Sequence, residues 1–369
     1  MLEFHKKKSK NPSKTEPEKR IKDFQEIYSQ FDKNDSVEQS SRCSQCGIPY
    51  CQIHCPLNNN IPDWLRYIAE GRLEEAYQVS ASTNAFPEVC GRVCPQDRLC
   101  EGNCVVEQAG FGAITIGNLE KYLTEIAWEK GWVKNLSSQN QYKQKVAIIG
   151  SGPAGMAASA YLIQNGYKVD VYEKNDRAGG LMIYGIPNFK LDKKIVERRT
   201  EWLTDSGVVF NLNTEVGKNI SFQDLEKDYD AILIATGVYK ARQLDIDTST
   251  VNNSIPALDF LIESNRTGLG DSPSKNKYLT AKDKHVVVIG GGDTAMDCVR
   301  TAIRQQAKEV TCLYRRNKEN MPGSAREVLN AEQEGIKFNW LSVPSKIISN
   351  NSSGTSMTYK VAALGEVDE

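Results

Sequence analysis

The sequence lacks long apolar runs and any excess of charge of one sign. No stretch approaches the roughly 20 apolar residues needed to cross a bilayer, and the charged N-terminus lacks the apolar segment of a secretory signal. The 46 Lys and Arg residues nearly balance the 47 Asp and Glu residues, so no strong cationic field is available to bind a nucleic acid. We therefore expect a cytoplasmic protein that binds neither membranes nor nucleic acids.

Histidine is also scarce, which argues against common hydrolytic chemistry. The chain has only His5, His54 and His285, and none stands in a Ser/His/Asp or metal-ligand pattern. Cys298 and Cys312 are too far apart in sequence to form a C-x-x-C redox pair, so we expect both to be core thiols. No catalytic residue is assigned from these patterns.

The distribution of cysteine divides the chain. Its 369 residues exceed the usual size of one domain, and eight of its ten cysteines lie between Cys43 and Cys104. Residues 1–20 are Lys-rich and interrupted by prolines, which predicts a solvated polar tail. Apolar residues then recur at helical spacing over residues 21–31, which predicts a short amphipathic helix. Pro62 and Gly71 indicate the start of one helix and the break before another.

The N-terminal cysteines are spaced as in iron–sulfur proteins. They form the runs C-x2-C-x4-C-x3-C, followed by proline, and C-x5-C-x3-C. Short thiolate spacings with Cys-Pro steps are typical of ferredoxin-like clusters, whereas structural zinc usually shows two regular C-x2-C pairs. We expect two four-iron clusters, with a zinc site or plain buried thiols as the weaker alternatives. Two clusters need eight ligands, and only seven cysteines match, so the eighth ligand stays open, with Cys90 as one candidate.

Two segments predict strand–turn–helix–strand units that bind dinucleotides. In the first, Gly150, Gly152 and Gly155 form G-x-G-x-x-G after the apolar strand 145–149, and Glu173 ends the next strand, where an acid can accept hydrogen bonds from a ribose. The alternative is a tight turn in an ordinary α/β domain with a surface glutamate.

The second unit spans residues 284–314 and departs from the first at its second strand. Gly290, Gly292 and Ala295 form the G-x-G-x-x-A variant, and Tyr314 takes the position of the ribose-binding acid, followed by two arginines. A guanidinium can pair with a 2′-phosphate that a carboxylate would repel, so NADP(H) is preferred over NAD(H). The alternative is that Arg315 and Arg316 form a solvated strand end.

These patterns predict an α/β protein with two Rossmann-like dinucleotide-binding domains preceded by a mainly α-helical iron–sulfur domain. A further strand is expected within residues 229–237, and residues 264–283 are expected to be a connection. The predicted division is a tail over 1–20, an iron–sulfur domain over 21–133, a first nucleotide domain over 145–263 and a second over 284–369. A nicotinamide donates two electrons as hydride and clusters accept one at a time, so a flavin is expected between them.

Long segments resemble the small (beta) subunit family of NADPH-dependent glutamate synthase, whose N-terminal domain is shared with dihydropyrimidine dehydrogenase. The segments are RCSQCGIPYCQIHCPLNNNIPDW, NAFPEVCGRVCPQDRLCEGNC, AGGLMIYGIPNFKLDKKIVERR and MPGSAREVLNAEQEG. The resemblance implies that the first unit binds FAD and the second NADPH. The candidate FAD-binding residues are Gly150, Ser151, Gly152, Pro153, Ala154, Gly155, Glu173, Gly180, Leu181, Lys190, Val216 and Gly237. The candidate NADPH-binding residues are Gly290, Gly292, Asp293, Thr294, Ala295, Arg315 and Arg316.

The resemblance also implies the cluster ligands. One [4Fe-4S] cluster would take Cys43, Cys46, Cys51 and Cys104, and the other would take Cys55, Cys94, Cys100 and a side-chain oxygen of Glu120. Cys90 would then bind neither cluster.

The function implied is that of an NADPH-oxidising electron-transfer subunit that serves the glutamate synthase large (alpha) subunit. A related reductase that serves ferredoxin or a pyrimidine dehydrogenase is the alternative, and an inactive fragment is another. In the family a flavin-covering segment follows the NADPH domain, and nothing after MPGSAREVLNAEQEG matches it. From the sequence we therefore expect weak FAD retention.

Overall fold

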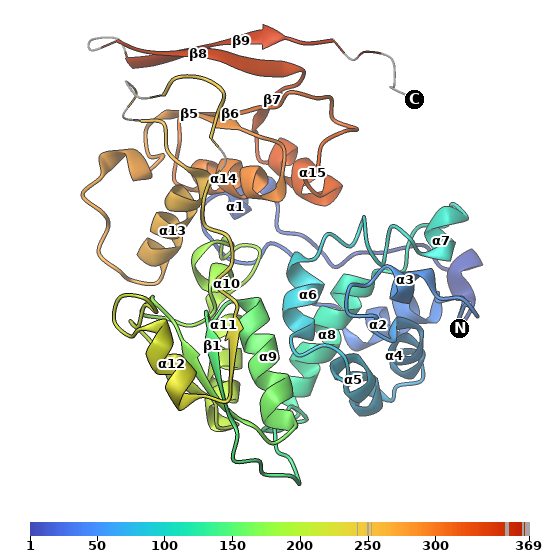
Figure 1. Ribbon diagram of the computed structural model, residues 1–369. Coiled ribbons are helices and arrows are strands. Elements are labelled where there is room, and N and C mark those ends of the chain that lie inside the picture. The colour runs from blue at the N-terminus through green and yellow to red at the C-terminus, as the bar shows by residue number, and fades with distance from the viewer. Residues whose placement is uncertain (242, 249–250, 252, 351–353, 364, 366–369) are drawn as a thin grey trace. The chain divides into compact units, whose positions relative to one another are not determined.

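The computed structural model describes residues 1–241, 243–248, 251, 253–350, 354–363 and 365, which divide into two compact units (Figure 1). The first unit contains Met1–Thr15, Glu26–Ile183 and Phe189–Gly237, and the second contains Glu16–Gln25, Tyr184–Asn188 and Val238–Glu369. The cysteine-rich segment and the first dinucleotide segment therefore share one unit. Residues 366–369, close to the point where the expected flavin-covering segment would follow, lie outside the described residues.

The N-terminal part of the first unit is helical, as predicted. Its helices are α2 (Lys33–Ser41), α3 (Tyr50–Ile53), α4 (Ile61–Ala69), α5 (Leu73–Ala81), α6 (Pro87–Val93), α7 (Val105–Gln108) and α8 (Ile116–Glu129). Gly71, with φ of 77°, separates α4 from α5, because this left-handed backbone favours glycine. Trp64 of α4 and Leu119 of α8 are fully buried in the core that these helices share. Among the described residues, no helix is long and apolar enough to cross a membrane.

The predicted amphipathic helix over residues 21–31 is wrong. The chain forms the short helix α1 (Pro17–Arg20) and then runs without helix to α2, which begins where the Asp32 carboxylate accepts a hydrogen bond from the Asp35 amide. Residues 27–29 pair instead with residues 13–15, and the Thr15 amide donates to the Ile27 carbonyl at 2.9 Å. Ile27 and Phe31 are buried as predicted, but an extended segment buries them.

The predicted solvated tail over residues 1–20 is also wrong. In the first unit the Leu2 amide donates to the Cys43 carbonyl at 3.0 Å, and Phe4, within the short helix η1 (Glu3–His5), packs against the Phe111 ring. In the second unit Arg20 is buried and donates to the Glu334 carboxylate at 2.8 Å. Lys-rich composition did not reveal these contacts, because many of them use backbone groups, such as the carbonyls of Lys7 and Lys8 and the amide of Lys10, while most side chains of the segment stay exposed.

The first dinucleotide segment forms a parallel sheet in the order β3-β2-β1-β4. Its strands are β1 (Lys145–Ile149), β2 (Lys168–Tyr172), β3 (Val209–Asn211) and β4 (Ala231–Ile234), and its helices are α9 (Pro153–Gln164), α10 (Leu181–Tyr184), α11 (Lys193–Asp205) and α12 (Phe222–Asp228). Figure 1 shows α9 and α11 beside this sheet. Strand β1 lies between β2 and β4, so the chain order switches direction at β1, the position where such sheets bind nucleotides.

The second unit contains a parallel sheet in the order β5-β6-β7 and an antiparallel hairpin. Its elements are α13 (Ala257–Gly268), η2 (Lys277–Leu279), β5 (His285–Ile289), α14 (Asp293–Arg304), β6 (Glu309–Leu313), α15 (Ala325–Gln333), β7 (Lys337–Asn339), β8 (Ser342–Asn350) and β9 (Gly354–Val361). The connection predicted over 264–283 is partly wrong, because its first five residues complete α13. That helix packs on α14, which explains why an apparently polar stretch is helical.

A buried ion-pair network fixes one end of the second sheet. Three guanidinium groups, from Arg20, Arg300 and Arg304, surround the Glu334 carboxylate at 2.8, 2.9 and 2.7 Å. Burial alone would raise the pKa of Glu334, but hydrogen bonds from Arg304 and the charge of Arg300 lower it to about 2. Arg300 also pairs with Glu327, so the network joins α1, α14 and α15 through charge rather than apolar packing.

A second buried network joins the N-terminal helices to the first parallel sheet within the first unit. Arg199 of α11 donates two hydrogen bonds, of 2.6 and 2.8 Å, to the Glu88 carboxylate of α6. The Arg199 guanidinium lies 5.0 Å from the Trp128 ring centre and 4.8 Å from that of Trp202. The preceding residue, Arg198, pairs with Glu125 of α8 at 2.9 Å. We call the contact between Glu88 and Arg199 the junction pair.

Removing one member of the junction pair is expected to destabilise this unit strongly. In Arg199→Ala the buried Glu88 carboxylate loses its two close hydrogen bonds and keeps only Arg198, at 3.6 Å, as a counter-ion, which should lower the free energy of unfolding by about 3 kcal/mol. Urea unfolding followed by tryptophan fluorescence measures this loss, since Trp128 and Trp202 flank the guanidinium. The matched control is Arg72→Ala, which breaks an exposed pair with Glu75 and should leave the midpoint unchanged. Equal midpoints for the two variants would contradict this role.

Candidate functional site

Four cysteines from both cysteine runs gather at one side of the helical domain, and we call Cys43, Cys46, Cys51 and Cys104 the first thiol group. Burial, followed by repulsion from Cys43 and Cys104, raises the pKa of Cys51 to about 12. Burial likewise raises the pKa of Cys43, with Cys104 and Cys46 adding to it. These mutual effects indicate that the cysteines of the two runs lie near one another, and Cys51 also raises the pKa of Cys100. Gln45, whose backbone has φ of 52°, donates from its side chain to the Cys43 sulfur at 3.3 Å.

The second thiol group, defined as Cys55, Cys94 and Cys100 together with Glu120, lies beside α6 and α8. Burial raises the pKa of Cys100, and Glu101, Glu120 and Cys55 raise it further. Glu120 is buried, which raises its pKa, and its carboxylate accepts a hydrogen bond from Asn84 at 3.1 Å.

Cys90 also lies near this second group. Its hydrogen bond to Cys94, followed by burial, raises its pKa, and its sulfur lies 3.8 Å from the Asn84 side-chain oxygen. The structure therefore keeps both candidates for the eighth ligand, Cys90 and Glu120, next to the other members.

The two thiol groups fit iron–sulfur clusters in their chemistry. Thiolates are the ligand form, and burial disfavours them unless a cation compensates the charge, as the irons of a cluster would. Among the described residues no three His, Cys, Asp or Glu side chains converge on the position of a single metal ion. A four-iron cluster does not require such convergence, because each thiolate binds a different iron.

The turn after β1 has the geometry of a pyrophosphate cradle. Gly150 has φ of 105°, and a Cβ there would lie 2.5 Å from the Ala235 carbonyl oxygen. A Cβ on Gly155 would lie 2.0 Å from the Gly150 carbonyl oxygen, so the strand and helix can approach only with glycine at both positions. Gly152 faces open space, and no side chain caps the N-terminus of α9 that follows it. The backbone N–H groups at the start of α9 can therefore donate hydrogen bonds to a phosphate.

Three other predicted FAD-binding residues, Ser151, Glu173 and Gly180, contact this turn. The Ser151 hydroxyl donates to the Glu173 carboxylate at 2.6 Å, and the Ser151 carbonyl accepts from the Gly179 amide at 3.0 Å. Gly180 lies against Gly152, since a Cβ on Gly180 would be 2.6 Å from the Gly152 Cα. Pro153 and Ala154 begin α9, Leu181 begins α10, Lys190 lies between α10 and α11, Val216 bridges to Ile220, and Gly237 follows β4.

The turn after β5 repeats this geometry. Gly290 has φ of 140°, and Gly292 precedes α14, whose N-terminus also has no side-chain cap. Asp293, Thr294 and Ala295 are the first residues of that helix. A Cβ on Gly291 would lie 2.4 Å from the Tyr314 ring, which explains why a glycine also stands between Gly290 and Gly292.

Hydrogen bonding shows that Tyr314 occupies the position of Glu173. The Glu173 amide donates to the Asn211 carbonyl, and the Tyr314 amide donates to the Asn339 carbonyl, each at 3.0 Å and each on the strand next in the sheet. Arg315 and Arg316 follow, and both are exposed. Within the described part of the chain neither guanidinium has an ion-pair or hydrogen-bond partner, so both remain available to an anion.

Some contacting residues were missed by sequence reasoning. The turn at residues 321–324 closes on the second cradle, where the Gly323 amide donates to the Gly291 carbonyl at 2.7 Å and the Ser324 amide donates to the Asp293 carboxylate at 3.0 Å. The Pro-Gly dipeptide within MPGS is the sequence signal that could have predicted this turn. Asn84 gave no comparable signal, because an isolated asparagine is common in loops.

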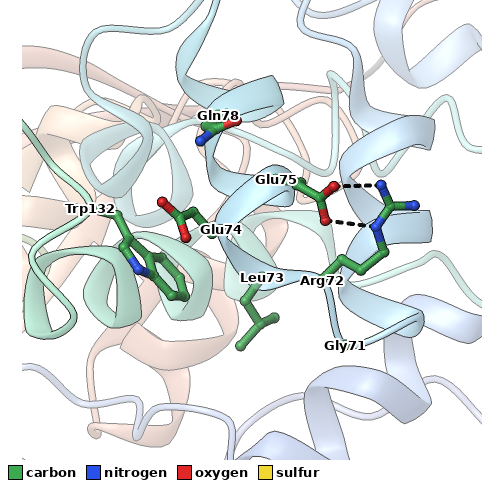
Figure 2. A pocket seen from close by; sticks show the side chains of 7 residues that line it. All are labelled: Gly71, Arg72, Leu73, Glu74, Glu75, Gln78 and Trp132. Carbon is green, nitrogen blue, oxygen red and sulfur yellow. Dashed lines mark hydrogen bonds and ion pairs between the residues drawn. The ribbon is translucent and has the colours of Figure 1, made fainter.

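A surface cavity of about 570 Å³ lies at the start of α5 and includes none of the predicted site residues. Figure 2 shows Arg72 held by two hydrogen bonds to Glu75, with Trp132 on the other side. Because its only cation is already paired, this cavity offers no specific chemistry for a ligand.

Two family models match consecutive parts of the chain. The model described as dihydropyrimidine dehydrogenase domain II, 4Fe-4S cluster, matches residues 20–132, and the model described as pyridine nucleotide-disulphide oxidoreductase matches residues 144–368. Together with the two parallel sheets they confirm the predicted fold class.

Relatives match most of the chain. The glutamate synthase [NADPH] small chain of Azospirillum brasilense is 54% identical over 93% of this chain and 72% of its own length. That of Escherichia coli is 46% identical over 94% of this chain and 74% of its own length. Among solved structures, Mycobacterium tuberculosis FprA in complex with NADPH is 19% identical with a TM-score of 0.46, and the match covers 59% of this chain and 67% of that chain. The sequence relatives and the second family model show that this chain is an NADPH-dependent oxidoreductase and belongs to the family of NADPH-dependent glutamate synthase small chains.

Proposed function

We propose that this chain accepts electrons from NADPH and delivers them singly, through FAD and two [4Fe-4S] clusters, to a glutamate synthase large subunit that makes L-glutamate from L-glutamine and 2-oxoglutarate. Bound FAD supplies the conversion between hydride transfer and single-electron transfer. The chain's own residues bind and orient the redox groups, because hydride transfer needs positioning rather than a general base.

One observation carries this proposal: helix α11 contacts both the flavin-type cradle and the iron–sulfur helices. Val196 of α11 packs against Gly179, where a Cβ would lie 2.6 Å from the valine side chain, and Gly179 bonds to the cradle residue Ser151. One turn along α11, Arg199 holds Glu88, which acts electrostatically on Cys90 and Glu120. A single helix thus contacts both the segment beside the first cradle and α6, the helix that precedes Cys94 of the second thiol group, which supports electron transfer between the two sites.

The remaining cysteines support electron transfer without a dithiol step. Cys298 lies on α14 and Cys312 on β6, and burial raises the pKa of both thiols. Neither cysteine belongs to a C-x-x-C motif, and both are buried. The thiols that can act in redox chemistry are therefore those of the N-terminal domain.

The large-subunit partner is inferred from the relatives. Both are named small chains, which implies a complex with a large one, and this chain is about half identical to each. No cysteine stands in a recognisable nucleophile setting for amide hydrolysis, so release of ammonia from glutamine is assigned to that partner.

Reconstitution tests the proposed function. The purified chain, loaded anaerobically with iron, sulfide and FAD, is mixed with the large subunit, NADPH, glutamine and 2-oxoglutarate. We expect NADPH oxidation coupled to L-glutamate formation, which stops when either protein is omitted. NADPH oxidation that requires ferredoxin or a pyrimidine dehydrogenase instead would favour the alternative reductase.

The cofactor preference can be tested at Arg315 and Arg316. Replacing both with alanine should weaken NADPH binding by about 1–3 kcal/mol, the usual range for a charge-assisted hydrogen bond to phosphate. NADH binding should change little, because it has no 2′-phosphate. Calorimetric titration with each nucleotide measures the two affinities. Equal losses for NADPH and NADH would refute the assignment.

Cluster content can be tested with paired cysteine variants. Anaerobically purified protein should contain two four-iron clusters, and Cys46→Ser should lose about half of the iron and acid-labile sulfide because one ligand set is broken. Cys90→Ser is the matched control and should lose neither cluster if Glu120 is the eighth ligand. Bound zinc, or loss of sulfide in Cys90→Ser, would contradict these assignments.

A further inference from the structure

Four exposed apolar side chains lie on the chain segment that carries cysteines of both thiol groups. The side chains of Ile48, Tyr50, Ile53 and Leu57 are exposed by 63, 48, 57 and 43%. Tyr50 and Ile53 stand three residues apart on α3, so they share one face of that helix. We call these four residues the exit face. Cys51 of the first thiol group and Cys55 of the second lie between them in the chain, and Cys46 lies just before this segment.

The exit face carries no formal charge. Residues 43–62 include no Asp, Glu, Lys or Arg, although such residues make up 25% of the chain. The flanking Arg42 is buried, and its guanidinium donates hydrogen bonds to the carbonyls of Phe111, Gly112 and Ala113 at 2.8, 2.7 and 2.6 Å. Depletion of charge together with exposed aromatic and aliphatic side chains is typical of the core of a protein–protein interface, not of ordinary surface.

The exit face and the junction pair use different parts of the helical domain. The second thiol group includes Glu120 of α8 and lies near Glu88 of α6, whose carboxylate holds α11 of the flavin-type sheet. In the first thiol group, Cys51 lies in α3, Cys43 and Cys46 lie in the loop before α3, and Cys104 directly precedes α7. Electrons that enter beside α6 and α8 would pass to the first thiol group and leave beside α3.

We propose that the exit face is the docking surface for the electron-accepting protein. A partner that approaches here must present an uncharged, apolar surface, because a charged group buried against residues 43–62 would find no counter-ion. This inference rests on the proposed function, under which the occupant is the glutamate synthase large subunit. Docking at this face covers the cysteines of the first thiol group and excludes water from the route between the two proteins.

Binding to the large subunit tests the docking surface. Calorimetry with the cluster-loaded chain and the purified large subunit of the same organism should give a dissociation constant that rises about tenfold or more in Ile48→Glu and in Ile53→Glu, since each buries an unpaired carboxylate. The matched control is Val209→Glu, at a side chain exposed by 53% on β3, and its affinity should equal that of the unsubstituted chain.

Two further readouts separate docking from damage. The iron and sulfide content of each variant must equal that of the unsubstituted chain, and hydrogen exchange in the unsubstituted chain should slow at residues 46–57 when the large subunit binds. Unchanged affinity in both variants, or exchange that slows only elsewhere, would overturn the docking surface while leaving the proposed function intact. Failure of the unsubstituted chain to bind would overturn the proposed partner, and the docking surface with it.

Discussion

The buried pair between Glu88 and Arg199 is the contact on which the arrangement of the first unit depends. Both side chains are removed from water, so each requires the other, and three aromatic rings around the guanidinium exclude solvent further. A buried pair of this kind contributes little net stability compared with an apolar contact, but it tolerates only one geometry. That property suits a junction between two redox domains, where the distance between redox groups governs the rate of transfer.

The two dinucleotide units show how one local difference changes the chemistry of a shared turn. Both place glycines with positive φ after the first strand and leave the following helix N-terminus uncapped. At the equivalent strand end, Glu173 is held by Ser151 and Asn175, whereas Tyr314 packs on Gly291 and is followed by exposed arginines. A fixed acceptor suits ribose hydroxyls, and exposed guanidinium groups suit a phosphate.

Sequence reasoning found the features that short-range rules govern. The glycine turns, the strands beside them and the cysteine runs follow from the steric freedom of glycine and from ligand spacing. It wrongly predicted a helix over residues 21–31, where apolar residues recur at helical spacing but the chain is extended. It also missed contacts between distant residues: Glu88 and Arg199 are 111 positions apart, and Arg20 and Glu334 are 314 apart. No local pattern distinguishes such buried charges from exposed ones.

The central claim is that two clusters lie in order between the flavin-type cradle and the surface of α3. Anomalous diffraction at the iron absorption edge, from crystals of anaerobically purified protein, locates iron directly. The account predicts two iron centres, one bounded by Cys43, Cys46, Cys51 and Cys104, and the other beside Cys55, Cys94 and Cys100, with the second nearer to Arg199. A single centre, a signal at the zinc edge alone, or the reverse order relative to α11 would contradict it.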